Sequence, residues 1–112
     1  MVLAGPDITN ARLLRLKKLK KLHTLQLWKT QVTDLSPLAG LSGLSTLHLK
    51  FTPVSDLSPL AGLSGLRWLD LCSTKVSDLS PLVGLGNLQA ISLSKDQEVL
   101  IPASLEKAVI RL

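Results

Sequence analysis

A repeat of 22 residues constrains this chain more than any other feature of its sequence. Residues 22–43, 44–65 and 66–87 read LHTLQLWKTQVTDLSPLAGLSG, LSTLHLKFTPVSDLSPLAGLSG and LRWLDLCSTKVSDLSPLVGLGN. Twelve of the 22 positions hold the same residue in all three copies, and a fourth copy begins at residue 88 and departs from the pattern after residue 96. Because a unit this short cannot bury its own leucines, the copies must stack on one another to form a core.

Each unit predicts a short strand followed by a single helical turn. The segment LxxLxL alternates apolar and polar residues, which is typical of a strand with one buried face. The later segment DLSPL predicts a 3₁₀ turn, because Ser is a favourable N-cap and Pro is favoured at the first helical position. A Gly three residues after the Pro keeps that turn short. The residues predicted to point into the core are Leu25 and Leu27, Leu47 and Leu49, Leu69 and Leu71, and Ile91 and Leu93.

These repeats resemble the leucine-rich-repeat family, in particular the 22-residue class of bacterial internalins, over residues 22–96. The resemblance implies an α/β fold: a short, curved, right-handed leucine-rich-repeat solenoid with a parallel sheet on its concave face and 3₁₀ turns on its convex face. In that family the concave face usually binds another protein. Thr30, Thr52 and Thr74 stand where the family usually has Asn, whose side chains form a hydrogen-bonded ladder that Thr replaces only in part. The secretion and wall-sorting signals of surface internalins are not seen, so an invasin-like role is not implied.

We expect residues 1–112 to form a single leucine-rich-repeat domain. Its parts are an N-terminal basic cap (1–21), three full repeats (22–43, 44–65 and 66–87) and a divergent last repeat with a C-terminal cap (88–112).

The two ends are predicted from the repeat frame and from helix signals. The segment RLKKLKKL (15–22) aligns with PLAGLSGL (37–44), which places Leu16, Leu19 and Leu22 in core positions. A short helix is expected over 10–20, starting at Thr9 or Asn10. At the other end we expect an extended segment over 99–101 and a helix over 104–112 with Ser104 as its N-cap.

Composition restricts the compartment and the cofactors. No basic stretch followed by a long apolar run begins the chain, and no segment reaches the roughly 18 apolar residues that span a bilayer. A single Cys excludes an internal disulfide. These features predict a cytoplasmic protein, with delivery as a secreted effector left open, and nothing in the sequence indicates a cofactor.

The variable positions of the repeat predict a recognition surface. Positions two, five, seven, eight and ten differ in all three full copies, and most of them flank the strand or lie on its solvent side. Parallel strands in register would align these residues in columns about 4.8 Å apart. The columns are Thr24, Thr46, Trp68 and Ala90; Gln26, His48, Asp70 and Ser92; and Trp28, Lys50, Cys72 and Ser94, with Lys29, Phe51, Ser73 and Lys95 at the lip.

An exposed Trp has no folding role and is enriched at binding hot spots. The predicted partner contacts are Trp28, Trp68, His48, Asp70, Lys50, Phe51, Gln26 and Cys72.

Cys72, His48 and Asp70 raise the alternative of a thiol hydrolase or a metal site. His48 and Asp70 are expected to be cross-strand neighbours within reach of a hydrogen bond. Cys72 would lie about 8 Å from His48 between Cα atoms, whereas a nucleophile and its base need heavy atoms within about 3.2 Å. Strand amides are committed to the sheet and cannot form an oxyanion hole, and the trio lacks the second His or CxxC pair of common metal sites. We therefore predict no enzyme and no metal centre.

The basic run RLLRLKKLKKL opens a second alternative. Residues 1–21 hold six basic residues and one acidic residue, while residues 22–112 hold seven of each, so the net charge of +5 is local to the N-terminal cap. The cap could contact nucleic acid or an anionic membrane surface through Arg12, Arg15, Lys17, Lys18, Lys20 and Lys21. Against this, its leucines are assigned to the core and no aromatic residue is present to stack on bases. Two further possibilities stay open: that the solenoid associates end to end with a second copy, and that it is the sensing arm of a larger protein.

Overall fold

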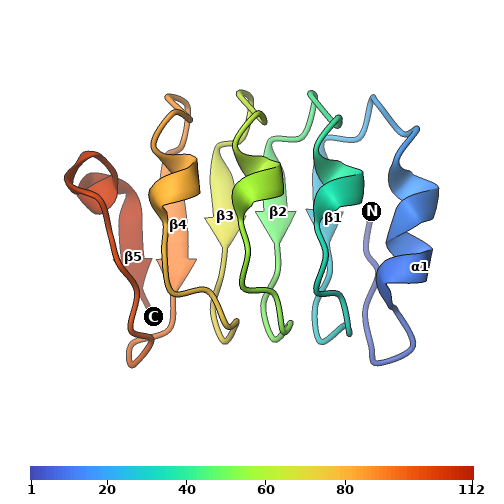
Figure 1. Cartoon of the computed structure of the whole chain (residues 1–112), viewed down its shortest axis with the longest axis horizontal. Helices are drawn as coiled ribbons and strands as arrows, with labels where there is room; N and C mark the ends of the chain where they lie inside the picture. The colour runs from blue at the N-terminus through green and yellow to red at the C-terminus, as the bar shows by residue number, and fades with distance from the viewer.

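Five parallel strands form one sheet and follow one another in chain order (Figure 1). The computed structural model describes all 112 residues. Its strands are β1 (Thr24–Gln26), β2 (Thr46–His48), β3 (Trp68–Asp70), β4 (Ala90–Leu93) and β5 (Val109–Arg111). The four strands predicted from the repeat are confirmed, whereas β5 was not predicted.

The register of the sheet follows the 22-residue period. Thr46 pairs with Thr24 on one side and with Trp68 on the other, and His48 lies between Gln26 and Asp70. Asp70 in turn pairs with Ser92. The first two predicted columns are therefore confirmed, since each repeat advances the chain by one strand without a shift in register.

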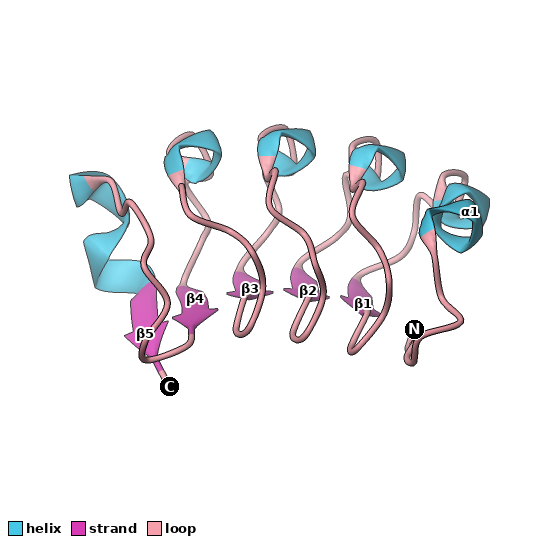
Figure 2. Ribbon diagram, turned by 60° about the horizontal axis from the view of Figure 1, so that its bottom comes forward, coloured by secondary structure: helices cyan, strands magenta, loops and turns pink.

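Three 3₁₀ turns lie opposite the sheet: η2 (Ser36–Leu38), η3 (Ser58–Leu60) and η4 (Ser80–Leu82). Figure 2 shows strands and turns as two layers, with the strands more closely spaced than the turns, so that the sheet lies on the inner side of the curve. No helix is long and apolar enough to cross a bilayer.

Leu35, Leu57 and Leu79 occupy the N-cap positions of these turns, and not the predicted serines. The residue before each N-cap is an aspartate, whose side chain accepts hydrogen bonds from the serine that begins the turn. Asp34 Oδ1 accepts hydrogen bonds from the amide N–H of Ser36 at 2.9 Å and from its hydroxyl at 2.5 Å. Asp56 and Asp78 hold Ser58 and Ser80 in the same way. The hydroxyl donor, followed by the amide donor, lowers the pKa of each of the three aspartates below its ordinary value of 3.8.

These aspartate–serine bonds predict a loss of stability in acid. Because each carboxyl has a lower pKa in the folded state than in the unfolded chain, its stabilising effect is complete above about pH 4 and is lost as pH falls through the folded-state pKa. The triple variant Asp34→Asn/Asp56→Asn/Asp78→Asn keeps an oxygen acceptor at each turn but cannot titrate. Its melting temperature, followed by circular dichroism from about pH 5 to about pH 2, should fall less steeply than that of the wild type. Equal slopes would contradict the assignment.

The core is entirely aliphatic. One cluster of 25 buried residues runs along the whole stack, and it consists of Leu, Val and Ile side chains. Thr30 and Thr52 are buried beside it. The hydroxyls of Thr30, Thr52 and Thr74 donate to the carbonyl three residues earlier, at 3.2, 2.7 and 2.8 Å. Each threonine therefore stabilises the turn of its own repeat and does not link one repeat to the next through this bond.

The N-terminal helix begins where predicted, after Thr9, but is shorter than predicted. The helical segment consists of α1 (Asn10–Leu13) and η1 (Leu14–Leu16) and ends well before residue 20. Thr9 occupies the N-cap position without a side-chain bond, while the side chain of Asn10 bonds to Thr33 and to the amide of Asp34 in the first repeat.

The repeat frame holds only partly in the segment 15–22. Leu16 is buried and Leu22 packs against the core, but Leu19 is exposed, so its predicted core position is wrong. The first residues of the chain run beside β1, where Val2 forms a parallel bridge with Gln26. The core leucines of the first repeat are thus covered by a strand-like segment and a short helix.

The C-terminal end does not form the predicted helix over 104–112. The chain makes the 3₁₀ helix η5 (Ala103–Ala108), with Pro102 and not Ser104 at its N-cap, and continues as β5. Val109 and Ile110 favour a strand, and the free edge of β4 offers them backbone partners. The extended segment over 99–101 was predicted correctly, since Leu100 forms a parallel bridge with Asp78.

Candidate functional site

All three aromatic residues of the chain are exposed and lie on the solvent side of the sheet. Trp28, Phe51 and Trp68 are 42%, 48% and 43% exposed, and the chain has two Trp, one Phe and no Tyr. We define the sheet face as the solvent-facing side chains of β1–β4 together with the two residues that follow each of β1 to β3 outside the core, such as Trp28, Lys50 and Phe51. The largest apolar side chains of the protein are therefore placed on this face and not in the core.

A hollow of about 370 Å³ lies at the end of the sheet face where the strands turn. Trp28 and Phe51 provide its apolar walls, and it is also lined by Lys29, Lys50, His48 and Asp70. The Trp28 ring meets the His48 ring edge to face, with centroids 6.1 Å apart at 84°. The ammonium groups of Lys29 and Lys50 lie 5.8 and 5.3 Å from the centroid of Phe51, within the range of a cation–π contact.

A second hollow of about 270 Å³ lies beside the first. Trp68 is the largest of the side chains that line it. The lining residues are Thr46, His48, Trp68, Leu69, Asp70, Ala90 and Ser92. His48 and Asp70 line both hollows, so the two form one continuous concavity divided by this pair.

Within the His48–Asp70 pair, the Asp70 carboxylate is held by a hydrogen bond, whereas His48 Nδ1 is not. Asp70 Oδ1 accepts a hydrogen bond from the amide N–H of Cys72 at 3.0 Å. Its other oxygen is 3.7 Å from His48 Nδ1, which is too long for the predicted hydrogen bond. His48 Nδ1 has no hydrogen-bond partner and is shielded from solvent.

A left-handed backbone conformation recurs at the lip of the sheet face. Lys29, Phe51 and Ser73 occupy the same position of three successive repeats and have φ values of 57°, 59° and 56°. This conformation costs about 1–2 kcal/mol for a residue with a Cβ. Because it occurs in every full copy, it belongs to the turn of the repeat and not to one specialised site. It directs Lys29 and Phe51 to the edge of the first hollow.

Cys72 was wrongly predicted to be a surface contact. Its side chain is 4% exposed, and burial, reinforced by a hydrogen bond to Asp70, raises the pKa of the thiol to about 11. A cysteine nucleophile needs a lowered pKa and access to solvent, so Cys72 has the properties of a structural residue. No group of three His, Cys, Asp or Glu side chains lies close enough to hold a metal ion.

The structure brings together six of the eight predicted contacts. Trp28, His48, Lys50, Phe51 and Asp70 line the first hollow, and Trp68 lines the second. Gln26 belongs to the same column as His48 but lies beside the N-terminal segment, away from both hollows. Lys29, Thr46 and Ser92 also line the concavity although they were not predicted contacts, and their columns in the repeat are the signal that identifies them.

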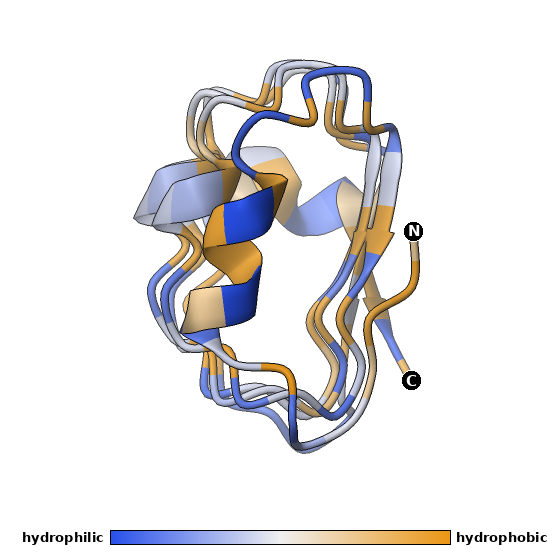
Figure 3. Cartoon of the chain, turned by 90° about the vertical axis from the view of Figure 1, so that its right-hand side faces the viewer, coloured by the Kyte–Doolittle hydropathy of each residue, from blue (hydrophilic) through white to orange (hydrophobic).

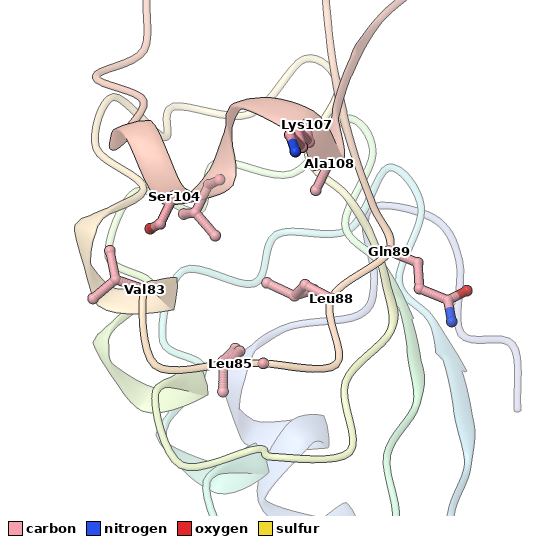
Figure 4. Close-up of a pocket in the computed structure, with 9 residues that line it drawn as sticks. Val83, Leu85, Leu88, Gln89, Ser104, Lys107 and Ala108 are labelled. Atoms are coloured by element: carbon pink, nitrogen blue, oxygen red, sulfur yellow. The ribbon is translucent and has the colours of Figure 1, made fainter.

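A third hollow, also about 370 Å³, lies on the other side of the molecule, where η5 leaves the regular stack. Figure 4 shows Val83 and Ser104 at one end of it, Leu85 and Leu88 along its floor, and Gln89 pointing away. Its walls are side chains of the last regular repeat and of the C-terminal cap. The two do not pack closely there, because η5 is longer than the three-residue turn η4 of the regular repeat. It is a packing gap between the last regular turn and the cap, with Lys107 as its one charged residue.

The six predicted basic residues all lie exposed at the N-terminal end. No Lys or Arg of the chain lies within 4.0 Å of a carboxylate, because the one acid–base contact is the His48–Asp70 pair. Lys20 Nζ donates to the carbonyl of Gly40 at 3.2 Å. The positive charge of this end is therefore not offset by direct ion pairs, and its one carboxylate, that of Asp7, lines a small hollow with Arg12 and Arg15.

Comparison with known proteins agrees with this architecture. A family model for leucine-rich repeats (two copies) matches residues 20–62, while no curated protein sequence matches the chain. The structure superposes on an internalin (inlF) from Listeria monocytogenes with a TM-score of 0.84 and 28% identity, covering 98% of this chain and 32% of the internalin. Internalin C2 (inlC2) of the same organism gives a TM-score of 0.68 and 28% identity over 98% of this chain and 60% of its own.

A plant protein shares the fold over a smaller part. The leucine-rich-repeat ectodomain of the receptor kinase SOBIR1 from Arabidopsis thaliana has a TM-score of 0.61 and 28% identity, over 72% of this chain and 50% of that one. The chain spans about a third of the length of the first internalin.

Proposed function

We propose that this chain, which matches a leucine-rich-repeat family model over residues 20–62 and is similar in structure to two internalins, is a non-catalytic recognition module that binds a protein partner through its sheet face. Domains of this fold are typically protein-interaction modules. The observation that carries the proposal is the exposure of Trp28, Phe51 and Trp68 on one face of a protein whose core contains no aromatic residue. Exposed aromatic side chains contribute nothing to this core, whereas at interfaces Trp is a preferred anchor.

The chemistry of the face favours a partner with two protruding side chains. An apolar group would fit against Trp28 and Phe51, where it would be removed from water. A carboxylate on the partner would find Lys29 and Lys50 at the rim of the same hollow. The smaller second hollow, beside Trp68, would accept a neighbouring residue of the partner. The central His48–Asp70 pair would be covered by such a complex.

The comparison of repeat copies supports the same surface. Framework positions such as those of DLSPL are identical in all three full copies, while most of the polar and aromatic residues that line the concavity differ from copy to copy. Stacking needs the framework to be constant and places no such demand on the solvent side of the strands. Variation on the solvent side of the strands gives this face a shape of its own, as recognition of one partner requires.

We expect the variant Trp28→Ala/Trp68→Ala to lose at least about 100-fold in affinity for the partner, because each hot-spot Trp contributes about 2 kcal/mol or more. The partner is first captured from a cell lysate with immobilised wild-type protein, and its affinity for each purified variant is then measured by calorimetry. The matched control is Leu14→Ala/Val83→Ala, which also removes two exposed apolar side chains but lies off the sheet face. Affinity of the Trp variant within twofold of the control would contradict the proposal.

The chain covers a third of the first internalin and half of the receptor ectodomain. We propose that the same sheet face would serve as the sensing surface where such a unit forms part of a larger protein. The partner-binding measurement applies unchanged to that case, since it tests the face and not the length of the chain.

A further inference from the structure

The N-terminal end of the solenoid concentrates unpaired positive charge. The N-terminal basic cap (1–21) contains one acidic residue, Asp7, and six basic residues, all within 12–21: Arg12, Arg15, Lys17, Lys18, Lys20 and Lys21. All six side chains are exposed, and none of them lies within 4.0 Å of a carboxylate. The remainder of the chain from residue 22 is balanced, with seven basic and seven acidic residues.

Two leucines are exposed among these charges. Leu14 is 61% exposed and Leu19 is 40% exposed. The repeat frame assigned Leu19 to the core, and this was the argument against a surface role for the basic run. The helical segment ends at Leu16, and the chain then turns, with the amide of Leu19 bonded to the carbonyl of Leu16. Leu13 and Leu16 alone anchor the segment in the core, which leaves Leu14 and Leu19 outside.

The exposed leucines lie within one turn of basic side chains. On a helical segment, residues three positions apart are neighbours on the surface, which places Leu14 next to Lys17, the C-cap residue whose amide bonds to the Leu14 carbonyl. Leu19 follows Lys18 and precedes Lys20 in the chain. Figure 3 looks onto this end of the molecule and shows hydrophilic and hydrophobic residues alternating along the short helix, with a hydrophilic loop above it. The basic cap is thus a mixed surface of cations and aliphatic side chains at one end of the stack.

We propose that the basic cap docks this protein onto the surface of an anionic lipid bilayer. Lysine and arginine side chains gain attraction from anionic headgroups, while adjacent leucines enter the boundary between headgroups and acyl chains. Binding to nucleic acid would explain the exposed cations but would give the exposed leucines no role. The cap also has no aromatic side chain for stacking on bases. Docking through this end leaves the sheet face free, since the cap residues line neither of its hollows.

The proposal is tested by co-sedimentation of the full chain with phosphatidylcholine vesicles that contain about 30 mol% phosphatidylglycerol. Wild-type protein should bind these vesicles and should not bind vesicles of phosphatidylcholine alone. The variant Lys17→Gln/Lys18→Gln/Lys21→Gln should bind at least about 30-fold more weakly, because each cation near the surface contributes to the attraction. It spares Lys20, whose bond to Gly40 supports the cap.

The matched control is Lys75→Gln/Lys95→Gln/Lys107→Gln, which makes the same change in net charge at exposed positions outside the cap. Its binding should stay within about threefold of the wild type, since these residues lie beyond the Debye length of the docked end. Equal losses in the two triple variants would show a general effect of net charge and would overturn the proposal.

The variant Leu14→Ser/Leu19→Ser distinguishes binding to a lipid bilayer from binding to other polyanions. It should weaken vesicle binding by about tenfold or more and leave binding to a DNA duplex unchanged at the same salt concentration. Vesicle binding that is insensitive to the leucines, or duplex binding tighter than vesicle binding, would overturn the bilayer assignment. Circular dichroism of each variant verifies the fold, and the substituted side chains are exposed.

Discussion

Replacement of Leu47 by alanine is expected to lower the free energy of unfolding by about 3 kcal/mol. Leu47 lies at the centre of β2, is fully buried, and has Leu25 and Leu69 as its register partners on the neighbouring strands. Removal of its side chain would leave a cavity in the middle of the stack, which neither neighbour can fill without leaving the register. Urea unfolding followed by circular dichroism measures the change.

The exposed Leu14 provides the control for that prediction. Leu14→Ala removes the same atoms from a side chain that is mostly in solvent, so its effect should stay within about 0.5 kcal/mol. A solenoid has contacts only between adjacent repeats, and a gap in a central repeat therefore weakens two interfaces. A loss of less than about 1 kcal/mol in Leu47→Ala would show that the stack repacks, contrary to the rigid register described above.

Deletion of residues 103–112 is expected to destabilise the protein by at least about 4 kcal/mol, which is a large part of the stability of a domain of this size. The deletion removes the buried side chain of Leu105, worth about 2–5 kcal/mol, and uncovers the core residues Ile91 and Leu93. It also removes the backbone bonds between β4 and β5, including that from the amide of Leu112 to the carbonyl of Leu93. The melting temperature and the urea midpoint of the truncated chain would report the loss.

The control for this deletion is a single substitution that changes the sequence of the C-terminal segment but leaves the segment in place to cover the core. Ile110→Thr keeps a β-branched residue at an exposed position of β5, so the strand should persist and the stability change should remain below about 0.5 kcal/mol. If the truncated chain unfolds at the same urea concentration as Ile110→Thr, the C-terminal segment does not cap the core.

The repeat made most of the fold predictable because identical units impose identical neighbours. Leu25, Leu47 and Leu69 recur at one position of the unit, and stacking brings them into register without further information. The same stacking predicts that Trp28, Trp68 and the His48–Asp70 pair lie on one face. Prediction failed at the caps, where a segment has a repeat on one side only. There Leu19 had no second neighbour to cover it, and Val109–Arg111 found a free strand edge in place of helical partners.

Cys72 shows that the size of a side chain, and not only its position in the repeat, decides whether that side chain is exposed. It occupies the same position as Trp28 and Lys50, which are exposed, yet it is buried. Its short side chain lies within hydrogen-bond reach of Asp70 and Ser94 and is covered, whereas the longer Trp and Lys side chains extend past their neighbours into solvent. The predicted contact at this position failed for that reason.

The sequence by itself determined the repeat, the register, the aliphatic core and the face on which the aromatic residues lie, because a 22-residue period leaves a stacked chain one way to bury its leucines. The tertiary structure alone decided that an Asp side chain bonds to the Ser that begins each turn, that His48 and Asp70 approach without a hydrogen bond, and that Leu14 and Leu19 lie exposed among the basic residues. These outcomes depend on side-chain direction and on what covers the two ends of the stack, and both are set by contacts between residues far apart in the chain.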